Sequence, residues 1–148
     1  MHPPKILPPH YFLLSLACMA AITFWWGRGF IDHPLIYIGC VPMLAGLYIA
    51  ARASRQFSQA GTNIIPLSKS TALVTDGMFK WTRNPMYTGM IAFLAGLALV
   101  LDNPWNWLVV GAFTLLIRQL FVLREEQLML QTFGDDYAAY TEKVRRWL

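Results

Sequence analysis

The stretch "RNPMYTGMIAFLAGLALVL", from Arg83 to Leu101, joins a polar corner to a long apolar run. The run from Met86 onward is slightly shorter than the roughly 20 residues that a helix needs to cross the hydrocarbon core of a bilayer. Pro85 suits the first position of a helix, where its missing N–H costs nothing. Asn84 precedes the proline and is expected to be extended. The stretch therefore predicts a membrane helix that begins at a polar corner.

The rest of the chain is similarly apolar. Of its 148 residues, 56% are hydrophobic and 14% are charged, against about 45–50% and about 25% in globular proteins. Three further apolar runs cover about Tyr11–Trp26, Leu35 to about Ala53, and Trp105 to about Val122. In lipid the backbone must satisfy its own hydrogen bonds, which favours helices. We expect an all-α integral membrane protein with about four transmembrane helices, in a single domain covering residues 1–148.

Small and cyclic residues predict how these helices turn and pack. The tripeptide "DNP" between the third and fourth runs is short enough to require an antiparallel hairpin, and Pro42 is expected to kink the second helix. Small residues recur at every fourth position in the second and third runs, a spacing that lets membrane helices approach closely. These residues are Gly46, Ala50, Ser54, Ala92 and Gly96.

The basic residues predict the orientation. One side carries Arg52, Arg55, Lys69, Lys80, Arg83, Arg124, Lys143, Arg145 and Arg146, whereas the other side carries Arg28 alone. By the positive-inside rule, both termini and the central loop are cytoplasmic. The net charge of +4 is not gathered into a basic–aromatic surface of the kind that binds nucleic acid. His2, His10 and His33 are scattered, so no metal site is expected.

The C-terminal segment predicts more helix outside the membrane. Residues 123–133 are expected to continue the fourth helix into the cytoplasm, and Gly134 to end it. Asp135 or Asp136 is expected to cap a last amphipathic helix that runs to Trp147. Tyr137, Tyr140, Val144 and Trp147 share one face of that helix. The basic residues beside them suit anionic lipid headgroups.

Three features carry candidate chemistry. Free N–H groups at the start of the third helix, next to Arg83, suit a carboxylate or a phosphate. Tyr87 adds a ring and a hydroxyl there, and Gly89 lets a bulky group approach. The alternative is an interfacial helix start with a snorkelling arginine. The other two features lie at the end of the fourth run and just after it.

Glu125 and Glu126 offer fixed negative charge, although such pairs also form ordinary solvated helix faces. Arg118 lies in the apolar part of the fourth helix, seven residues before Glu125 and therefore on the same face at α-helical spacing. An ionisable group in a span is a functional candidate, with snorkelling to the interface as the alternative. The three features together describe a guest with a carboxylate and with positive or hydroxyl groups, and S-adenosylmethionine fits that description.

Two longer stretches carry a resemblance. The segments "GTNIIPLSKSTALVTDGMFKWTRNPMYTG" and "REEQLMLQTFGDDYAAYTEKVRRW" closely resemble the isoprenylcysteine carboxyl methyltransferases and their bacterial and phospholipid methyltransferase relatives. The resemblance runs from Gly61 onward. It implies a small membrane enzyme that uses S-adenosylmethionine, with the cofactor-binding part in about residues 61–148.

The resemblance also implies site residues. Arg83, Pro85, Tyr87 and Gly89 match the family's Arg-His-Pro-x-Tyr-x-Gly motif. Asn84 stands where histidine is usual; it can donate a hydrogen bond but cannot shuttle a proton. The implied cofactor-binding residues are Thr62, Arg83, Asn84, Tyr87, Gly89, Glu125, Glu126, Tyr137 and Tyr140. As a hypothesis about the mechanism, we expect Glu125 and Arg118 to be the catalytic residues, with Arg118 holding an acceptor carboxylate.

The function expected is methyl transfer from S-adenosylmethionine to a lipophilic acceptor at the cytoplasmic face of a membrane, with the bacterial inner membrane favoured. A carboxylate acceptor is favoured because it is ionised at neutral pH, whereas an amine needs a base and no histidine is near. Four alternatives remain open: a phospholipid or small-amine N-methyltransferase, an NADPH-dependent enzyme similar to sterol reductases, a transporter, and a non-catalytic membrane scaffold. The sequence names neither the acceptor nor the oligomeric state.

Overall fold

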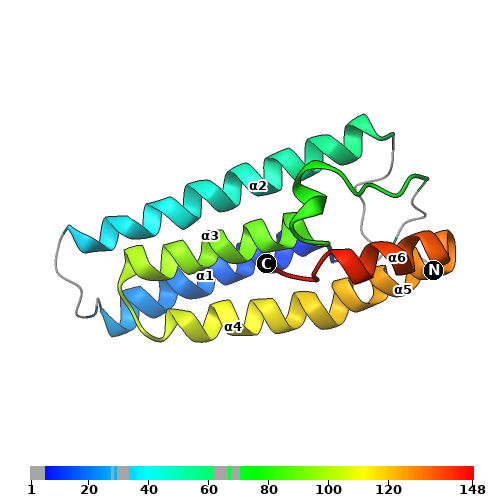
Figure 1. The fold of residues 1–148 in the computed structure, drawn as a ribbon. Helices are drawn as coiled ribbons and strands as arrows, with labels where there is room; N and C mark the ends of the chain where they lie inside the picture. The colour runs from blue at the N-terminus through cyan, green and yellow to red at the C-terminus, as the bar shows by residue number, and fades with distance from the viewer. Residues whose placement is uncertain (1–5, 28, 30–33, 62–66, 68–70) are drawn as a thin grey trace.

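The structure is a computed structural model that describes residues 6–27, 29, 34–61, 67 and 71–148. Over these residues the regular structure is entirely helical (Figure 1). In chain order the elements are α1 (Pro8–Trp26), the 3₁₀ turn η1 (Leu35–Gly39), α2 (Cys40–Gln59), the 3₁₀ turn η2 (Gly77–Lys80), α3 (Pro85–Leu101), α4 (Asn106–Ile117), the π-helical η3 (Arg118–Val122), α5 (Leu123–Phe133) and α6 (Asp135–Lys143).

The membrane part agrees with the predicted fold class. By length and composition, three helical stretches in the described residues can cross a bilayer, namely Pro8–Trp26, Leu35–Gln59 and Asn106–Phe133. The fourth apolar helix, α3, is shorter, at 17 residues. It lies between α2 on one side and α1 and α4 on the other (Figure 1). The chain is therefore an all-α integral membrane protein, and a total of four spans stays a prediction.

Glycines set the contact between α2 and α3. A Cβ on Gly46 would collide with the carbonyl oxygen of Gly89, and a Cβ on Gly89 would collide with that of Gly46. Gly39 and Gly96 meet in the same way. The two backbones therefore touch directly, as the spacing of small residues predicts. Pro42 lies in the first turn of α2, after the 3₁₀ turn η1, and the kink expected there stays a prediction.

The fourth apolar run continues without a break into α5, as predicted. Together α4, η3 and α5 form a helix of 28 residues. At 1.5 Å per residue such a helix is about 42 Å long, well beyond the roughly 30 Å of the hydrocarbon core. Its C-terminal part therefore extends beyond the membrane and lies alongside α6 (Figure 1).

Two predictions about the last helix are wrong. No aspartate side chain caps α6, which starts directly after Gly134 at a φ of 53°. The helix ends at Lys143, and Val144 is extended. The reason is that the following backbone pairs elsewhere: the amide of Arg83 donates to the carbonyl of Arg145 at 2.9 Å. The chain after Lys143, which we call the C-terminal strap (residues 144–148), thus returns to the start of α3.

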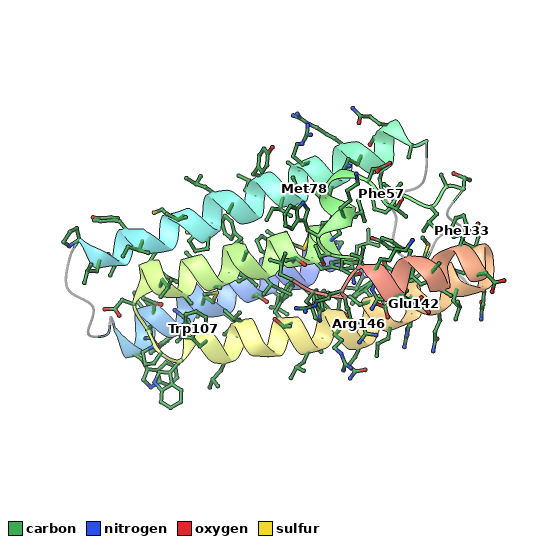
Figure 2. All side chains as sticks on the ribbon, in the orientation of Figure 1. Phe57, Met78, Trp107, Phe133, Glu142 and Arg146 are labelled. Carbon is green, nitrogen blue, oxygen red and sulfur yellow. The ribbon has the colours of Figure 1, made fainter. Side chains whose placement is uncertain are left out.

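The two tyrosines of α6 face inward. Tyr137 and Tyr140 form a small core with Ala53 of α2 and Phe79 of η2, so this face covers protein instead of lipid headgroups. Side chains from α2, η2 and α6 gather at this end of the molecule, around the labelled Phe57 and Met78, whereas Trp107 marks the other end (Figure 2). The bundle therefore has a membrane part and a second, smaller core at the end where α3 begins.

Candidate functional site

A cavity of about 320 Å³ lies between the two cores. Its walls come from the start of α1, the end of α2, the loop and turn before α3, the start of α3, and α5 and α6. Most of the wall is apolar, with Phe57, Val74, Met86, Met90 and Met129 among its residues. The polar residues of the wall are Arg83, Asn84, Tyr87, Glu125, Glu126, Tyr137 and Tyr140. An apolar cavity with a few converging polar groups is the usual form of a small-molecule site.

Hydrogen bonds anchor the loop that closes one side of the cavity. The side chain of Gln56 on α2 donates to the carbonyl of Asp76 at 3.0 Å and accepts from the amide of Met78 at 3.0 Å. Between them Gly77 has a φ of 58°, and a Cβ there would collide with the Gln56 side chain. The hydroxyl of Tyr140 donates to the carbonyl of Phe79 at 2.6 Å. The end of α2 and α6 thus hold η2 in place.

Tyr87 and Glu125 meet inside the cavity. The Tyr87 hydroxyl donates to Glu125 Oε1 at 2.8 Å across 38 residues of sequence. Each residue lies in the first turn of its helix, Tyr87 in α3 and Glu125 in α5. Tyr87 is buried and Glu125 is partly buried. A phenol that donates to a carboxylate fixes the orientation of that carboxylate.

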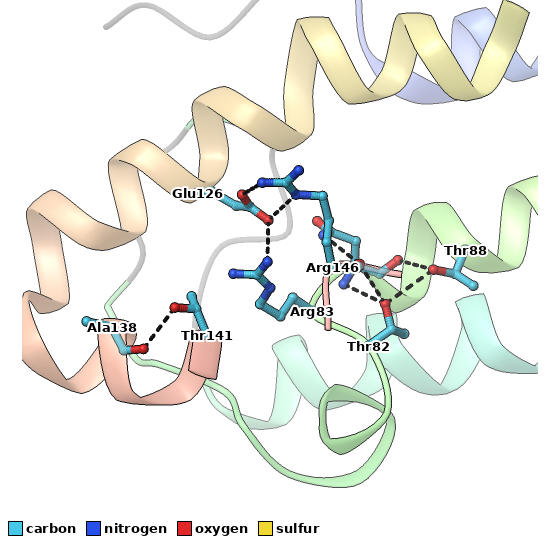
Figure 3. A network of polar contacts seen from close by, with 8 residues as sticks. Thr82, Arg83, Thr88, Glu126, Ala138, Thr141 and Arg146 are labelled. Carbon is cyan, nitrogen blue, oxygen red and sulfur yellow. Dashed lines mark hydrogen bonds and ion pairs between the residues drawn. The ribbon is translucent and has the colours of Figure 1, made fainter. Parts of the chain in front are cut away.

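Glu126 lies between two arginines (Figure 3). Arg146 makes two hydrogen bonds to it, Nε to Oε1 at 2.9 Å and Nη2 to Oε2 at 2.7 Å. Arg83 Nη2 lies 3.5 Å from Oε1. The hydrogen bonds to Glu126 raise the pKa of the Arg146 guanidinium above its usual value. The Glu126 charge is therefore shared unequally, with Arg146 as the main partner.

Arg83 keeps an unsatisfied donor. Its side chain is only 13% exposed, it lines the cavity, and its Nε is buried without a hydrogen-bond partner. Leaving a buried donor without an acceptor costs about 1–3 kcal/mol. The Arg83 side chain also lines the cavity, where its guanidinium charge would attract an anionic group. The residues present therefore fit a ligand that carries a carboxylate or a phosphate.

Asn84 joins the corner to the C-terminal strap. Its Nδ2 donates to the carbonyl of Arg146 at 3.1 Å, and the Thr82 hydroxyl donates to the same carbonyl at 2.9 Å. The hydroxyl of Thr88 donates to the carbonyl of Asn84 at 2.9 Å. Asn84 is N-terminal to Pro85 with φ −128° and ψ 55°, and its side chain does not cap α3. Its amide therefore holds the strap against the motif.

Tyr137 and Tyr140 present neutral phenols to the cavity. Burial, followed by the negative charge of Glu126, raises the pKa of the Tyr137 phenol to about 12. Burial also raises the pKa of Tyr140. Both groups therefore stay protonated at neutral pH, and Tyr140 uses its proton on the Phe79 carbonyl. These rings act as walls of the cavity and as hydrogen-bonding groups.

Seven of the predicted site residues come together at the cavity: Arg83, Asn84, Tyr87, Glu125, Glu126, Tyr137 and Tyr140. Thr62 lies outside the described residues. Gly89 does not line the cavity; it makes the backbone contact with Gly46 of α2. Its expected role next to a guest is therefore corrected to one in helix packing.

Arg118 is also away from the cavity lining. Its predicted alignment with Glu125 assumed regular α-helical spacing, but residues 118–122 form a π-helical turn. A π turn contains about one residue more than an α turn, so seven residues no longer equal two turns. The insertion rotates Glu125 relative to Arg118, and the expectation that the two share a face is wrong.

Several residues of the site were not predicted. Leu7, Pro8 and Pro9 at the start of α1 and Phe57 at the end of α2 line the cavity, although both segments precede the resembling part of the sequence. Arg146 was noted for its charge alone. Its position six residues after Tyr140, beyond the end of α6, carried no signal for the pairing with Glu126.

The comparisons with known proteins agree with this architecture. The family model of phospholipid methyltransferases matches residues 34–136. A probable protein-S-isoprenylcysteine O-methyltransferase of Oryza sativa subsp. japonica is 31% identical over 117 residues, which cover 76% of this chain and 60% of the relative. The Schizosaccharomyces pombe protein-S-isoprenylcysteine O-methyltransferase is 32% identical over 104 residues, covering 67% and 43%. The chain thus spans about half the length of these relatives.

A solved structure shows the same fold. The eukaryotic intramembrane Ras methyltransferase, an isoprenylcysteine carboxyl methyltransferase, matches with a TM-score of 0.70 at 23% identity, over 92% of this chain and 50% of that one. An uncharacterised protein of Haemophilus influenzae is 43% identical over 63 residues, which are 43% of this chain and all of that protein. The family model covers well over half of the sequence, and the motif around Arg83 and the glutamate pair lie within it. The chain therefore belongs to the phospholipid methyltransferase family, and its sequence and fold are similar to those of the isoprenylcysteine carboxyl methyltransferases.

Proposed function

We propose that this protein transfers a methyl group from S-adenosylmethionine to a lipophilic acceptor at the cytoplasmic face of a membrane. The observation that carries the proposal is the opposed charge in one apolar cavity. Arg83 places a guanidinium at the cavity wall, and Glu125 offers a carboxylate that Tyr87 orients at 2.8 Å. A ligand that carries both a carboxylate and a positive charge or hydroxyl groups satisfies both residues.

Different residues of the cavity would contact different parts of the cofactor. Arg83 would hold its carboxylate, and Glu125 would hold its ammonium or its ribose hydroxyls. Tyr137, Tyr140 and the apolar wall would enclose the rest. When bound, S-adenosylmethionine supplies a methyl group on a sulfonium, an intrinsically good leaving group. Activation is thus the cofactor's contribution, and the protein's contribution is to bind and to orient.

The chain's own residues act by position and by exclusion of water. Tyr87 keeps its proton on the hydroxyl and directs it to Glu125 Oε1, which holds the carboxylate in one orientation. Phe57, Met86, Met90 and Met129 give the cavity an apolar wall, which would disfavour water beside a bound cofactor. Holding two reactants in a productive geometry can correspond to effective molarities of about 10⁵ M or more. Arg118 is not included in the proposed site because it lies outside the cavity lining.

The acceptor is proposed to be a carboxylate on an isoprenylcysteine-like lipid. The relatives from Oryza sativa and Schizosaccharomyces pombe are named as protein-S-isoprenylcysteine O-methyltransferases, the former as a probable one. A carboxylate is also already ionised at neutral pH. The described residues that line the cavity and could act as a base are the carboxylates Glu125 and Glu126, and a carboxylate acceptor would need neither. The family description, phospholipid methyltransferase, supports N-methylation of a phospholipid amine as the second candidate.

The proposed setting is a bacterial inner membrane with the cavity on the cytoplasmic side. The cavity lies at the end of the bundle that carries Arg83, Arg124 and Arg146, which the positive-inside rule assigns to the cytoplasm. We further propose one domain over residues 1–148. The cofactor-binding part within it extends beyond residues 61–148, because α1 and α2 also contribute to the wall.

Calorimetric titration of the detergent-purified protein tests the cofactor. We expect wild type to bind S-adenosylmethionine and its demethylated product, and the Glu125→Ala variant to bind at least about tenfold more weakly through loss of a charge-assisted contact. Glu142→Ala is the matched control, because Glu142 is an exposed acid on α6. Folded wild-type protein that binds NADPH and not S-adenosylmethionine would overturn the proposal in favour of a reductase.

A labelled methyl donor then identifies the acceptor. Protein in liposomes is supplied with S-adenosylmethionine labelled in its methyl group, and with either an S-farnesylated N-acetylcysteine or phosphatidylethanolamine. Base-labile label on the farnesylated acid indicates a methyl ester and supports the carboxylate. Base-stable label on the phospholipid alone would replace it with N-methylation.

A further inference from the structure

Arg146, on the C-terminal strap, has no role in the proposed cofactor site. Its guanidinium faces Glu126 edge-on, with two hydrogen bonds at 2.9 and 2.7 Å. Arg83 approaches the same carboxylate with one nitrogen, at 3.5 Å. Bidentate arginine–carboxylate pairs are the stronger of these two arrangements. The main partner of Glu126 is therefore the residue that does not line the cavity.

This unequal sharing decides what Arg83 can do. Arg83 lines the cavity, and its Nε has no acceptor. The group of three consists of two cations and one anion, so one positive charge is left over next to the cavity. If Arg146 were absent, Glu126 would be the nearest partner for the whole Arg83 guanidinium. The Glu126 carboxylate would then neutralise the Arg83 charge, and Arg83 would bind an anionic ligand less well.

Hydrogen bonds to its main-chain carbonyls hold the C-terminal strap in place. The carbonyl of Arg146 accepts from Thr82 and from Asn84, at 2.9 and 3.1 Å. The carbonyl of Arg145 accepts from the amide of Arg83 at 2.9 Å. Main-chain contacts on both sides of the Arg146 side chain therefore fix its starting point. The same residues that form the corner of the motif determine where Arg146 lies.

We propose that Arg146 is a positioning residue: by occupying Glu126 it keeps Arg83 available for the carboxylate of the methyl donor. The proposal rests on the proposed function, since it assigns a partner to the donor's carboxylate. It also changes the role of Glu126 from a ligand of the cofactor to a bridge between two arginines.

The experiment is calorimetric titration of the full-length protein with S-adenosylmethionine and with decarboxylated S-adenosylmethionine. For Arg146→Ala we expect affinity for S-adenosylmethionine to fall about tenfold or more, as for the loss of a charge-assisted contact. Affinity for the decarboxylated compound should stay within about twofold, because it has no carboxylate for Arg83. Lys143→Ala, which removes an exposed cation at the end of α6, should change neither affinity.

A second variant separates this role from a merely structural one. In Glu126→Gln/Arg146→Ala the anion that would capture Arg83 is gone, so affinity for S-adenosylmethionine should recover to within a few-fold of wild type. Glu126→Gln alone should bind S-adenosylmethionine at least as tightly as wild type, and this holds whether or not Arg146→Ala folds.

Two results would overturn the assignment while leaving the proposed function intact. One is equal weakening of both compounds by Arg146→Ala with no recovery in the double variant, which indicates a structural strap. The other is weaker binding in Glu126→Gln alone, which indicates that Glu126 contacts the cofactor. Failure of wild type to bind S-adenosylmethionine at all would overturn the proposed function itself, and the assignment with it.

Discussion

Individual side chains in this protein connect helices that are far apart in the sequence. Tyr87 reaches Glu125 across 38 residues, and Asn84 reaches the Arg146 carbonyl across 62. Each bond replaces water with a partner for a group that is wholly or partly buried, and the alternative, an unpaired buried group, costs about 1–3 kcal/mol. The motif residues therefore do two things at once: they shape the cavity and they hold the helices that form it.

Tyr87→Phe tests the orientation of Glu125. The substitution keeps the ring and removes the donor to Oε1, so the carboxylate loses its fixed orientation. We expect the affinity for S-adenosylmethionine to fall about tenfold, as measured by calorimetry. Tyr11→Phe is the control, because Tyr11 also packs against Phe121 but lies on α1. Unchanged binding by Tyr87→Phe would contradict the orienting role, and tighter binding would show that the Tyr87 bond competes with the ligand.

Asn84→Ala tests the attachment of the strap. The carbonyl of Arg146 would keep the Thr82 hydroxyl and lose the Asn84 amide. Because that carbonyl keeps one partner, the loss corresponds to about 0.5–1.5 kcal/mol. We expect a drop of a few degrees in the apparent melting temperature, measured by tryptophan fluorescence in detergent. Asn84→His, which restores the residue usual in the family, should be less damaging because its ring can also donate. Equal loss in both variants would contradict this role.

At the scale of elements, packing details separate what the sequence could predict from what it could not. Small residues recur at every fourth position from Gly46 in α2 and from Ala92 in α3. This spacing predicted that the two helices approach closely, because it leaves a groove along each helix. The π turn at 118–122 could not be read from an apolar run, since hydropathy shows that a segment crosses the membrane and not how it is rotated about its axis. The wrong pairing of Arg118 with Glu125 follows from that difference.

Gly46→Ala tests the contact between α2 and α3. The added methyl group meets the carbonyl of Gly89, so the backbones must separate, at a cost of about 1–3 kcal/mol. Gly111→Ala is the matched control on α4, where an added Cβ meets nothing within 4 Å. It should stabilise by up to about 1 kcal/mol through helix propensity. Thermal unfolding of the two variants in the same detergent should shift in opposite directions, and a fall of similar size in both would count against a packing role.

For the molecule as a whole, the sequence predicts the fold class and the polar residues at the start of α3. It does not predict which segments enclose the cavity. Apolar runs and the Pro85 helix start carry their signal in a few neighbouring residues. The start of α1, the end of α2 and the strap join the cavity only after the helices have assembled, and Phe57 and Arg146 look like ordinary surface residues beforehand. The charges nevertheless predict how the assembled molecule is oriented in the membrane.

The orientation of the molecule in the membrane can be tested by labelling. The described basic residues gather around the cavity end, so this end should face the cytoplasm and the Asp102–Trp105 turn should face outward. In a background with Cys18 and Cys40 changed to alanine, we place single cysteines at two exposed positions, Pro104→Cys in the turn and Glu142→Cys on α6. On intact spheroplasts of a bacterial host, a membrane-impermeant maleimide should label the first and not the second. After permeabilisation both should react, because both side chains are exposed. Labelling of Glu142→Cys before permeabilisation would place the cavity on the outer face and would contradict the proposed access of the cavity to cytoplasmic S-adenosylmethionine.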